Sequence, residues 1–454
     1  MGRLFGTDGV RGVSNIELTV ELATDIGRAA AAALTDGDTQ RPKILIGKDT
    51  RISGDMLESA LAAGLCSVGA DVYIAGVVPT PAVAYLVQKY GMDAGIMISA
   101  SHNPYEYNGI KIFSGDGYKL PDAVEEKIEE LILDKKQELT MCTHGDIGKV
   151  TILDEAVADY VEYLTETVDV RFDGMKIALD CANGSSSVCA KVLFEMLGAT
   201  VFVDADTPNG TNINDGCGST HIENVVRLVK EHNCDCGFAF DGDADRCLAV
   251  DNEGELVDGD KLIAIAALDL KSRGKLKGNK AVVTVMSNLG FFRFASDNDV
   301  DVEITKVGDR YVLEEMLKGG YVVGGEQSGH IIFTDYATTG DGELSAIQTL
   351  AVVKRTGKSL KELATVMNVY PQVLVNITVN NQKKASLGTD TDIKAVISDV
   401  ESELGADGRV LVRASGTEPL IRVMLEGTDV EHIKCLAYKI SDVIAEKLDG
   451  KYSK

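Results

Sequence analysis

The stretch Ser99-Ala100-Ser101-His102-Asn103-Pro104 decides the fold of this chain, and it follows directly on an apolar, strand-like run over residues 94–98. A serine exposed after a strand, with His102 beside it and Lys111 ten residues on, suits a phosphorylated nucleophile whose charge is held by cations. A Ser/Asn/Pro turn without chemistry is the plain alternative for this loop alone. The remaining motifs have to decide between the two.

The second motif is acidic, Asp241-Gly242-Asp243-Ala244-Asp245-Arg246, and it follows the apolar run 236–240. Three carboxylates at alternate positions of a tight turn suit a hard divalent cation, and they would repel one another without one. An EF-hand is excluded, because the sixth position is Arg246 and the twelfth is Asn252. Mg²⁺ is favoured over a merely solvated acidic turn, since it takes few protein carboxylates and accepts substrate phosphate oxygens.

A third motif is rich in glycine, Gly324-Gly325-Glu326-Gln327-Ser328-Gly329-His330, and comes after the apolar run 321–323. Its glycines allow the backbone to approach a ligand closely. Glu326, Ser328 and His330 alternate, so we expect them to face one ligand, and their donors and acceptors match vicinal sugar hydroxyls. An ordinary glycine turn is the alternative.

The fourth motif, Arg413-Ala414-Ser415-Gly416-Thr417-Glu418-Pro419, follows the strand-like run 410–412. An arginine, two hydroxyls and glycine amides form a natural phosphate cradle. Glu418 and Pro419 suit the opening of a helix, whose N-terminus also favours an anion. A capped loop is the alternative.

Two further segments carry charge in loops. One is the glycine-rich opening, Gly6-Thr7-Asp8-Gly9-Val10-Arg11-Gly12, and the other is Lys48-Asp49-Thr50-Arg51 after an apolar strand. Either segment is also compatible with a purely structural role.

Together and in this order, the four motifs resemble the phosphoserine, metal, sugar and phosphate loops of the α-D-phosphohexomutase superfamily, one from each of four domains. Within that superfamily the chain is most similar to the bacterial phosphoglucosamine mutases. The similarity lies in the opening Phe5-Gly6-Thr7-Asp8-Gly9-Val10-Arg11-Gly12, in the fourth motif, and in Gln327, where the phosphomannomutase/phosphoglucomutase branch usually carries Met. No loop departs from the superfamily pattern.

The resemblance implies a phosphoryl transfer from phosphorylated Ser101 to a hexose monophosphate, through a hexosamine 1,6-bisphosphate that acts as intermediate and activator. It implies one Mg²⁺ held by Asp241, Asp243, Asp245 and the Ser101 phosphate. Proton transfer falls to His102 or Lys111, and the residues do not choose between them. The implied catalytic residues are Ser101, His102, Lys111, Arg11 and Arg246, and the implied substrate-binding residues are Glu326, Ser328, His330, Arg413, Ser415, Gly416 and Thr417.

Composition bounds the class of protein. A chain of 454 residues is too long for one core and implies several domains. Its net charge of −25 argues against nucleic acid or an anionic membrane as partner. An anionic substrate then needs local cations, and Arg11, Lys111, Arg246 and Arg413 can supply them.

The nine cysteines are odd in number and include no C-x-x-C pair, and residues 1–20 lack the apolar segment of a signal peptide. No apolar run is long enough to cross a bilayer. We therefore expect the protein to reside in the cytoplasm, where cysteine thiols are kept reduced. We expect the protein to bind a small-molecule hexose phosphate and to bind neither nucleic acid nor a membrane. The sequence does not decide between a homodimer and a monomer.

Periodicity predicts an α/β fold of four domains around a central cleft. Strand-like runs alternate with helical patterns in three similar blocks, which predicts α/β domains with mixed, mostly parallel sheets, followed by a C-terminal α+β domain. The predicted strands are 44–47, 72–75, 94–99, 176–180, 200–204, 237–241, 281–285, 302–305, 321–323, 373–379, 409–413 and 421–426. The predicted helices are 154–165, 187–197, 430–447 and one that Thr19 caps. The predicted domains are 1–153 with the phosphoserine loop, 154–253 with the metal loop, 254–369 with the sugar loop and 370–454 with the phosphate loop.

Three other functions compete with an amino-sugar mutase. A phosphomannomutase or phosphoglucomutase would use the same machinery and differ in the sugar. A non-catalytic sugar-phosphate sensor or scaffold would be favoured by loss of Ser101 or of a metal aspartate, and none is missing. A metal phosphatase would need a water-activating base near Ser101 and gains nothing from the cradle at Arg413.

Overall fold

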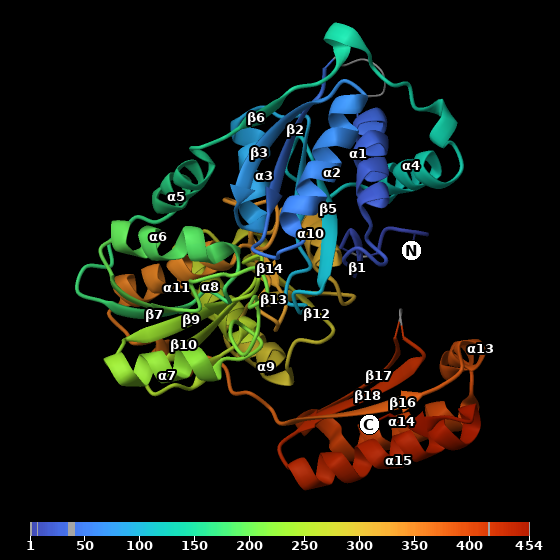
Figure 1. Ribbon diagram of the computed structural model, residues 1–454. Helices are drawn as coiled ribbons and strands as arrows, with labels where there is room; N and C mark the ends of the chain where they lie inside the picture. The colour runs from blue at the N-terminus through green and yellow to red at the C-terminus, as the bar shows by residue number, and fades with distance from the viewer. Residues whose placement is uncertain (1, 7, 35–40, 416–417, 454) are drawn as a thin grey trace. The chain divides into compact units, whose positions relative to one another are not determined.

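The structure is a computed structural model that describes residues 2–6, 8–34, 41–415 and 418–453. It divides into two compact units (Figure 1). Unit 1 is Met1–Met286 with Val300–Val366, and unit 2 is Ser287–Asp299 with Met367–Lys454. Three of the sheets belong to unit 1 and the fourth belongs to unit 2.

The first sheet has six strands in the order β1-β5-β4-β2-β3-β6. β2 runs parallel to β3 and β4, and β3 runs parallel to β6, whereas β5 is antiparallel to both β1 and β4. The strands are β1 (Val10–Val13), β2 (Lys43–Lys48), β3 (Asp71–Val77), β4 (Ala94–Ile98), β5 (Tyr107–Ser114) and β6 (Val150–Ile152). The helices that follow them are α1 (Val20–Leu34), α2 (Gly54–Ser67), α3 (Thr80–Lys89), α4 (Asp122–Leu133) and α5 (Ala156–Glu166), with 3₁₀ turns η1 (Lys136–Glu138) and η2 (His144–Asp146).

Helices α1, α2 and α4 share one core with this sheet. Thr19 Oγ1 accepts a hydrogen bond from Leu22 N at 3.2 Å, which confirms the predicted helix start. The core-facing side of α1 is buried at Ile26, Ala29, Ala30 and Ala33. α1 and α2 pack closely because Gly64 has no side chain; a Cβ there would lie 2.2 Å from the carbonyl oxygen of Thr24.

The second sheet has five strands in the order β11-β10-β9-β7-β8. β7 is parallel to β8 and β9, whereas β10 is antiparallel to β9 and β11, so parallel and antiparallel pairs are equal in number. The elements are β7 (Lys176–Asp180), η3 (Ser185–Val188), α6 (Ala190–Met196), β8 (Thr200–Asp204), α7 (Glu223–His232), β9 (Cys236–Phe240), β10 (Cys247–Asp251) and β11 (Leu256–Val257).

The third sheet has four strands in the order β13-β12-β14-β15, with β12 parallel to β13 and β14, and β14 antiparallel to β15. Helix α11 is buried at every residue from Gly342 to Val352 and contacts strands of both the second and the third sheet. The elements are α8 (Gly259–Ser272), η4 (Lys277–Asn279), β12 (Lys280–Thr284), β13 (Asp301–Thr305), α10 (Asp309–Gly319), β14 (Val323–Gly325), β15 (Ile331–Phe333), α11 (Gly342–Thr356) and α12 (Leu360–Ala364).

Unit 2 is built on a fully antiparallel sheet in the order β17-β18-β16-β19, with α14 and α15 sharing its core. It also holds α9, which lies between β12 and β13 in sequence and is joined to β18 by a hydrogen bond from Leu289 N to Glu426 Oε2 at 3.0 Å. The elements are α9 (Leu289–Asp297), β16 (Gln372–Thr378), α13 (Asn381–Lys384), η5 (Ala385–Gly388), α14 (Thr391–Leu404), η6 (Gly405–Asp407), β17 (Gly408–Ala414), β18 (Leu420–Gly427), α15 (Val430–Leu448) and β19 (Lys451–Tyr452).

All four sequence motifs occupy the same position in their sheets: each one connects two antiparallel neighbouring strands. The flanking residue pairs are Ile98 with Ile110, Phe240 with Cys247, Gly325 with Ile331, and Ala414 with Ile421. The motifs therefore lie at strand ends, as the sequence predicts. After each motif the backbone reverses direction and forms an antiparallel strand, not a helix.

The predicted fold class is confirmed, with mixed α/β sheets and a C-terminal antiparallel sheet under helices. Most strands match to within two residues. One prediction is wrong: Glu418 and Pro419 do not open a helix but lead straight into β18, because residues 420–427 are paired along both edges, with β16 and with β17.

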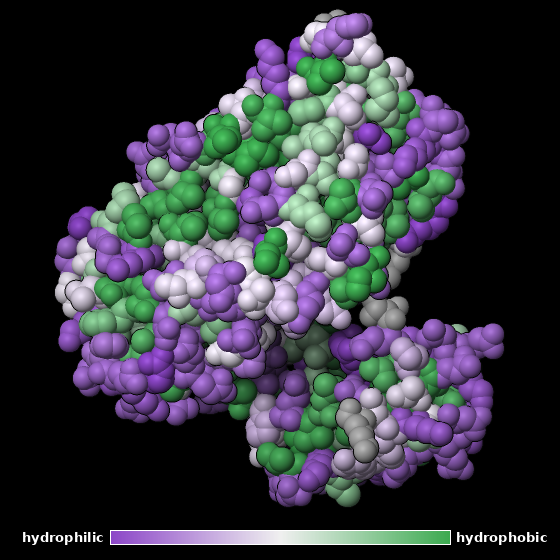
Figure 2. All heavy atoms as spheres, viewed as in Figure 1, coloured by the Kyte–Doolittle hydropathy of each residue, from purple (hydrophilic) through white to green (hydrophobic). Residues whose placement is uncertain are grey.

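The visible surface is mostly polar, as the charged composition leads one to expect, with scattered apolar residues between (Figure 2). None of the described helices is both long enough and apolar enough to span a bilayer.

Candidate active site

The phosphoserine loop is held from beneath by a buried ion pair that the sequence left unassigned. Arg51 Nε lies 2.8 Å from Asp49 Oδ2, and both side chains are fully buried. Asp49 Oδ2 also accepts a hydrogen bond from Ser99 Oγ at 2.7 Å, and Ser99 Oγ in turn accepts one from Ser101 N at 2.9 Å. The hydroxyl of Ser99, the second serine of this loop, is thus used in hydrogen bonds that hold the loop.

Ser101 itself has a left-handed backbone with φ 53° and is 1% exposed. This conformation is uncommon outside glycine, and such residues gather at functional sites. Ser101 Oγ donates a hydrogen bond to Asp241 Oδ2 at 2.6 Å and lies 3.3 Å from His102 Nδ1. The structure therefore brings the predicted nucleophile against the predicted metal loop.

The metal loop brings its three aspartates together. Asp241, Asp243 and Asp245 are buried, and one oxygen of each lies within 4.8 Å of the others. One oxygen of each carboxylate already has a partner. Asp241 Oδ2 accepts a hydrogen bond from Ser101 Oγ, and Asp243 Oδ2 accepts one from Thr80 Oγ1 at 2.5 Å. Asp245 Oδ2 forms an ion pair with Lys111 Nζ at 3.6 Å.

The remaining oxygens fit a divalent cation. Asp243 Oδ1 and Asp245 Oδ1 are buried and accept no hydrogen bond from any described residue, which is costly for a carboxylate oxygen unless a cation completes it. Burial and the neighbouring charges of Asp245 and Asp243 raise the pKa of Asp241 well above its usual range. Three all-oxygen ligands of this kind suit Mg²⁺.

Lys111 lies beneath the metal loop and is 2% exposed. Its Nζ is 2.7 Å from Asp243 Oδ2, 3.1 Å from Asp8 Oδ2 and 3.6 Å from Asp245 Oδ2. Burial alone would lower the pKa of Lys111, but these carboxylates outweigh it and raise the pKa. The ammonium group therefore stays charged at neutral pH in this arrangement.

His102 has a different electrostatic setting from Lys111. Burial, and then the positive charges of Arg246 and Arg11, lower the pKa of His102 to about 4. Arg11 pairs with Asp8, and Arg246 N donates to Asp241 Oδ1 at 3.2 Å. The predicted cations Arg11 and Arg246 are thus both in the electrostatic neighbourhood of the phosphoserine loop.

The residues of the sugar loop differ in burial. His330 is 2% exposed and turned inward, with Nδ1 3.7 Å from Asp245 Oδ2 and Nε2 accepting a hydrogen bond from Gly340 N at 3.1 Å. Ser328 is exposed and Glu326 is half-buried. The side chain of Gln327 donates to Asp258 Oδ2 at 3.2 Å.

In unit 2, the phosphate loop lies between β17 and β18. Arg413 and Arg422 are direct partners across this ladder, so two positive charges share one face. Burial and Arg422 lower the pKa of Arg413. Lys384 Nζ donates to the carbonyls of Ser415 and Glu418 at 2.7 and 2.6 Å. Gly416 and Thr417 lie outside the described residues.

Comparison with known proteins identifies the family. Four profiles of the phosphoglucomutase/phosphomannomutase family match: alpha/beta/alpha domain I at residues 2–139, domain II at 158–254, domain III at 258–370 and the C-terminal domain at 374–443. The chain belongs to this family.

Curated relatives from the family share more than half of the sequence. A protein of Caldicellulosiruptor saccharolyticus named phosphoglucosamine mutase is 57% identical over 450 residues, covering 99% of this chain and 100% of that one. One from Caldanaerobacter subterraneus subsp. tengcongensis with the same name is 56% identical over 449 residues, covering 99% and 100%.

A solved structure of the same family supports the fold. The Burkholderia thailandensis phosphoglucomutase/phosphomannomutase family protein aligns with a TM-score of 0.84 at 24% identity, covering 98% of each chain.

Sequence reasoning did not find every charged group in this phosphohexomutase site. Lys119 Nζ lies 2.5 Å from Asp8 Oδ1 and also pairs with Asp309, a residue 190 positions away. Asp309 Oδ2 is in turn 3.7 Å from His330 Nε2. The opening motif contained Asp8, but nothing local marks Lys119 or Asp309, because their partners are distant in sequence.

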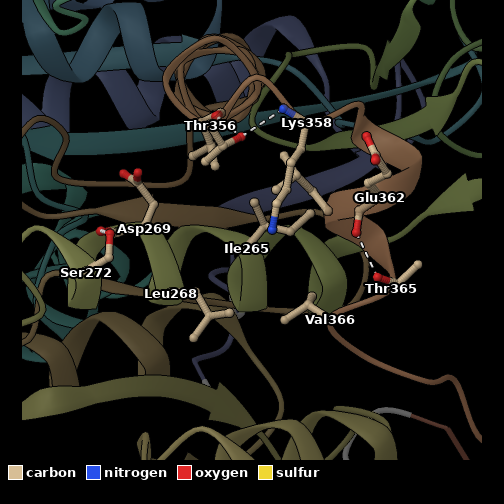
Figure 3. A pocket seen from close by; sticks show the side chains of 11 residues that line it. Ile265, Leu268, Asp269, Ser272, Thr356, Lys358, Glu362, Thr365 and Val366 are labelled. Carbon is tan, nitrogen blue, oxygen red and sulfur yellow. Dashed lines mark hydrogen bonds between the residues drawn. The ribbon is translucent and has the colours of Figure 1, made fainter.

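A further pocket of about 330 Å³ lies between α8 and the segment from α11 to α12 (Figure 3). Its lining is mainly apolar, with Ile265, Leu268 and Val366 among the residues shown. Its lining includes none of the site residues that the sequence predicts.

Proposed function

We propose that this protein interconverts glucosamine 6-phosphate and glucosamine 1-phosphate, as an isomerase that transfers a phosphoryl group within the sugar phosphate. The observation that carries this function is the full-length identity of 57% to a curated phosphoglucosamine mutase. The site supports it, because Ser101 Oγ, three clustered carboxylates and several cations lie together within unit 1. The product would feed amino-sugar nucleotide and cell-wall precursor synthesis.

The proposed reaction has two half-reactions. In the first, the bond between phosphorus and Ser101 Oγ breaks while a bond forms between phosphorus and the free hydroxyl oxygen of the substrate, giving hexosamine 1,6-bisphosphate. The hydroxyl proton passes through His102 to the departing Ser101 Oγ, because His102 Nδ1 lies 3.3 Å from that oxygen and the lowered pKa of His102 leaves its ring neutral. Lys111 is an ammonium that already holds its proton and contributes positive charge instead. The intermediate then turns over, and its other phosphoryl group returns to Ser101 with the opposite proton movement.

We assign the surrounding residues by their charge and position. Asp241, Asp243 and Asp245, with the Ser101 phosphate, would hold Mg²⁺, which when bound neutralises the charge that develops on the transferring group. Arg11 and Arg246 add positive charge on the side of His102. Glu326, Ser328 and His330 would bind the sugar, and Arg413, Ser415, Gly416 and Thr417 would hold the phosphate that is not reacting.

A phosphomannomutase or phosphoglucomutase is the second candidate, because the family profiles carry those names and the loop machinery is shared. A sensor is disfavoured by the complete nucleophile and metal loop, and a phosphatase gains nothing from paired arginines in unit 2.

A coupled assay with glucosamine, glucose and mannose phosphates tests the proposal. We expect the highest kcat/KM for glucosamine phosphate, with Ser101→Ala as the control for background turnover. A higher kcat/KM for mannose or glucose phosphate would refute the amino-sugar assignment and leave the mutase class intact.

We also propose a cytoplasmic location, which suits nine cysteines that form no disulfide. A homodimer stays a prediction, and light scattering coupled to size-exclusion chromatography distinguishes it from a monomer.

A further inference from the structure

A residue of the second α/β block reaches across to the phosphoserine loop. Asn214 lies in the segment between β8 and α7, and its side-chain Nδ2 donates to the carbonyl oxygen of Ser101 at 2.9 Å and to that of Asn103 at 3.1 Å. The side chain is 9% exposed. It thus binds both ends of the turn that carries the nucleophile.

The same two carbonyls also accept hydrogen bonds from Arg51, which belongs to the block of Ser101 itself. Arg51 Nη2 donates to Ser101 O at 2.9 Å and to Asn103 O at 2.8 Å. Arg51 comes from the first sheet's block, as Ser101 does, whereas Asn214 comes from the block of the metal loop. The turn is therefore clamped between a residue of its own block and a residue of the block that supplies the metal ligands.

Asn214 is itself fixed in place. Its backbone has φ 58°, a left-handed conformation that asparagine tolerates better than most residues, and its N–H donates to Ala182 O at 2.9 Å. Next to it, a side chain on Gly242 would place its Cβ 2.6 Å from Ser101 O and 2.9 Å from Asn214 Nδ2. The metal loop, Asn214 and the Ser101 carbonyl are thus packed too closely for any side chain larger than glycine at position 242.

We propose that Asn214 is a positioning residue for phosphoryl transfer at Ser101. The role rests on the proposed function. Ser101 has a left-handed backbone with its Oγ directed at Asp241, and Asn214 ties the carbonyls of that turn to the second block, beside Gly242 of the metal loop. Transfer between Ser101 Oγ and a sugar hydroxyl needs the two loops in register, and a displacement of about 1 Å can cost roughly 100-fold in rate.

Asn214→Gly is the sharpest test, because glycine adopts the left-handed backbone without strain and removes only the side-chain donor. Asn233→Gly is its matched control. Asn233 is also left-handed, with φ 50°, belongs to the same block and caps the exposed end of α7. Both variants are compared with the wild type by steady-state kinetics, by single-turnover transfer from the phosphoenzyme and by thermal unfolding.

We expect Asn214→Gly to lower kcat about 10- to 100-fold, to slow single-turnover transfer by the same factor and to leave KM within about twofold. Asn233→Gly should match the wild type in kcat. A kcat within about twofold of the wild type for Asn214→Gly, or a lower unfolding temperature with unchanged kcat, would overturn the positioning role.

Asn214→Asp is the second variant, since it keeps the size and places a carboxylate oxygen against the two carbonyls. It should lose at least as much kcat as Asn214→Gly, and failure of both variants to fold would make Asn214 a stability residue instead. The assays use whichever hexose phosphate the wild type turns over best. A wrong sugar assignment therefore leaves this test intact, whereas a wild type without any mutase activity refutes the proposed function itself.

Discussion

The phosphoserine and metal loops of unit 1 differ from the phosphate loop of unit 2 in how their charged side chains are paired. In unit 1 the buried charges compensate one another, with Lys111 among Asp8, Asp243 and Asp245, and Arg51 against Asp49. In unit 2, Arg413 faces Arg422 across the ladder and forms no ion pair with any described residue. The charges of the first region are paired within the protein, whereas we expect a bound anion to neutralise those of the second.

This contrast predicts different kinetic signatures. Groups fixed before binding act mainly on the transition state, so their loss lowers kcat. A cationic cradle that acts on a phosphate remote from the reacting bond holds the ground state and the transition state alike, so its loss raises KM.

The largest effect should come from Ser101→Ala. We expect kcat to fall at least about 1,000-fold with a smaller change in substrate affinity, because the covalent acceptor is lost while the binding groups remain. Intact-protein mass spectrometry should find one phosphate on the active wild type, at Ser101. Near-normal turnover of Ser101→Ala with phosphate on Ser99 would reverse the assignment.

Removal of the metal should come next. Chelation should reduce activity about 100-fold or more and Mg²⁺ should restore it, since the three carboxylates are costly without a cation. Asp245→Asn should raise the Mg²⁺ concentration needed for half-maximal activity. Full activity after exhaustive chelation would contradict the role of all three aspartates.

In unit 2, Arg413→Ala should raise KM about 10-fold with little change in kcat, which corresponds to the loss of one charge-assisted hydrogen bond. Arg422→Ala should raise KM less, because Arg422 is already held by Glu418 at 2.5 Å. Steady-state kinetics at two salt concentrations measure both. A fall in kcat with constant KM for Arg413→Ala would erase the difference between the two regions.

The smallest effect concerns a buried acid of unit 1. Glu343 on α11 is fully buried, and Cys189 Sγ, 3.0 Å away, is its one hydrogen-bond donor among the described residues. Burial raises the pKa of Glu343 to about 8. The unfolded chain loses this proton near the usual pKa of 4.5, whereas the folded protein keeps it to about 8. The stabilisation is therefore complete below that lower value and is lost as pH rises towards 8, by at most about 1.4 kcal/mol per pH unit.

Glu343→Gln should flatten the fall in melting temperature between about pH 6 and about pH 8, because glutamine stays neutral. Glu426→Gln is the contrasting variant in unit 2, since Glu426 is equally buried but pairs with Arg409 at 2.9 Å. It should lower the melting temperature across the range. Parallel wild-type and Glu343→Gln curves would show that Glu343 does not titrate there.

The sequence alone predicted the fold class, the bounds of twelve strands to within two residues and the positions of the four loops. These features are local: β7 and β8 coincide with their predicted bounds because each is a short apolar run, and Asp241, Asp243 and Asp245 converge because they alternate in one turn. Local chemistry of this kind survives folding unchanged.

Only the tertiary structure decided what the loops touch. Periodicity did not predict the return strands β5, β10 and β15, which are defined by their antiparallel pairing with β4, β9 and β14. At Pro419 the expected helix is replaced by β18, because β18 pairs along both of its edges. Lys119 and Asn214 carry no local signature, because their side-chain partners lie at least 111 residues away along the chain. The Asp49–Arg51 pair is local, but the backbone carbonyls that Arg51 binds lie at least 50 residues away. Such contacts depend on which strand ends the sheets bring together, and sequence spacing does not encode that.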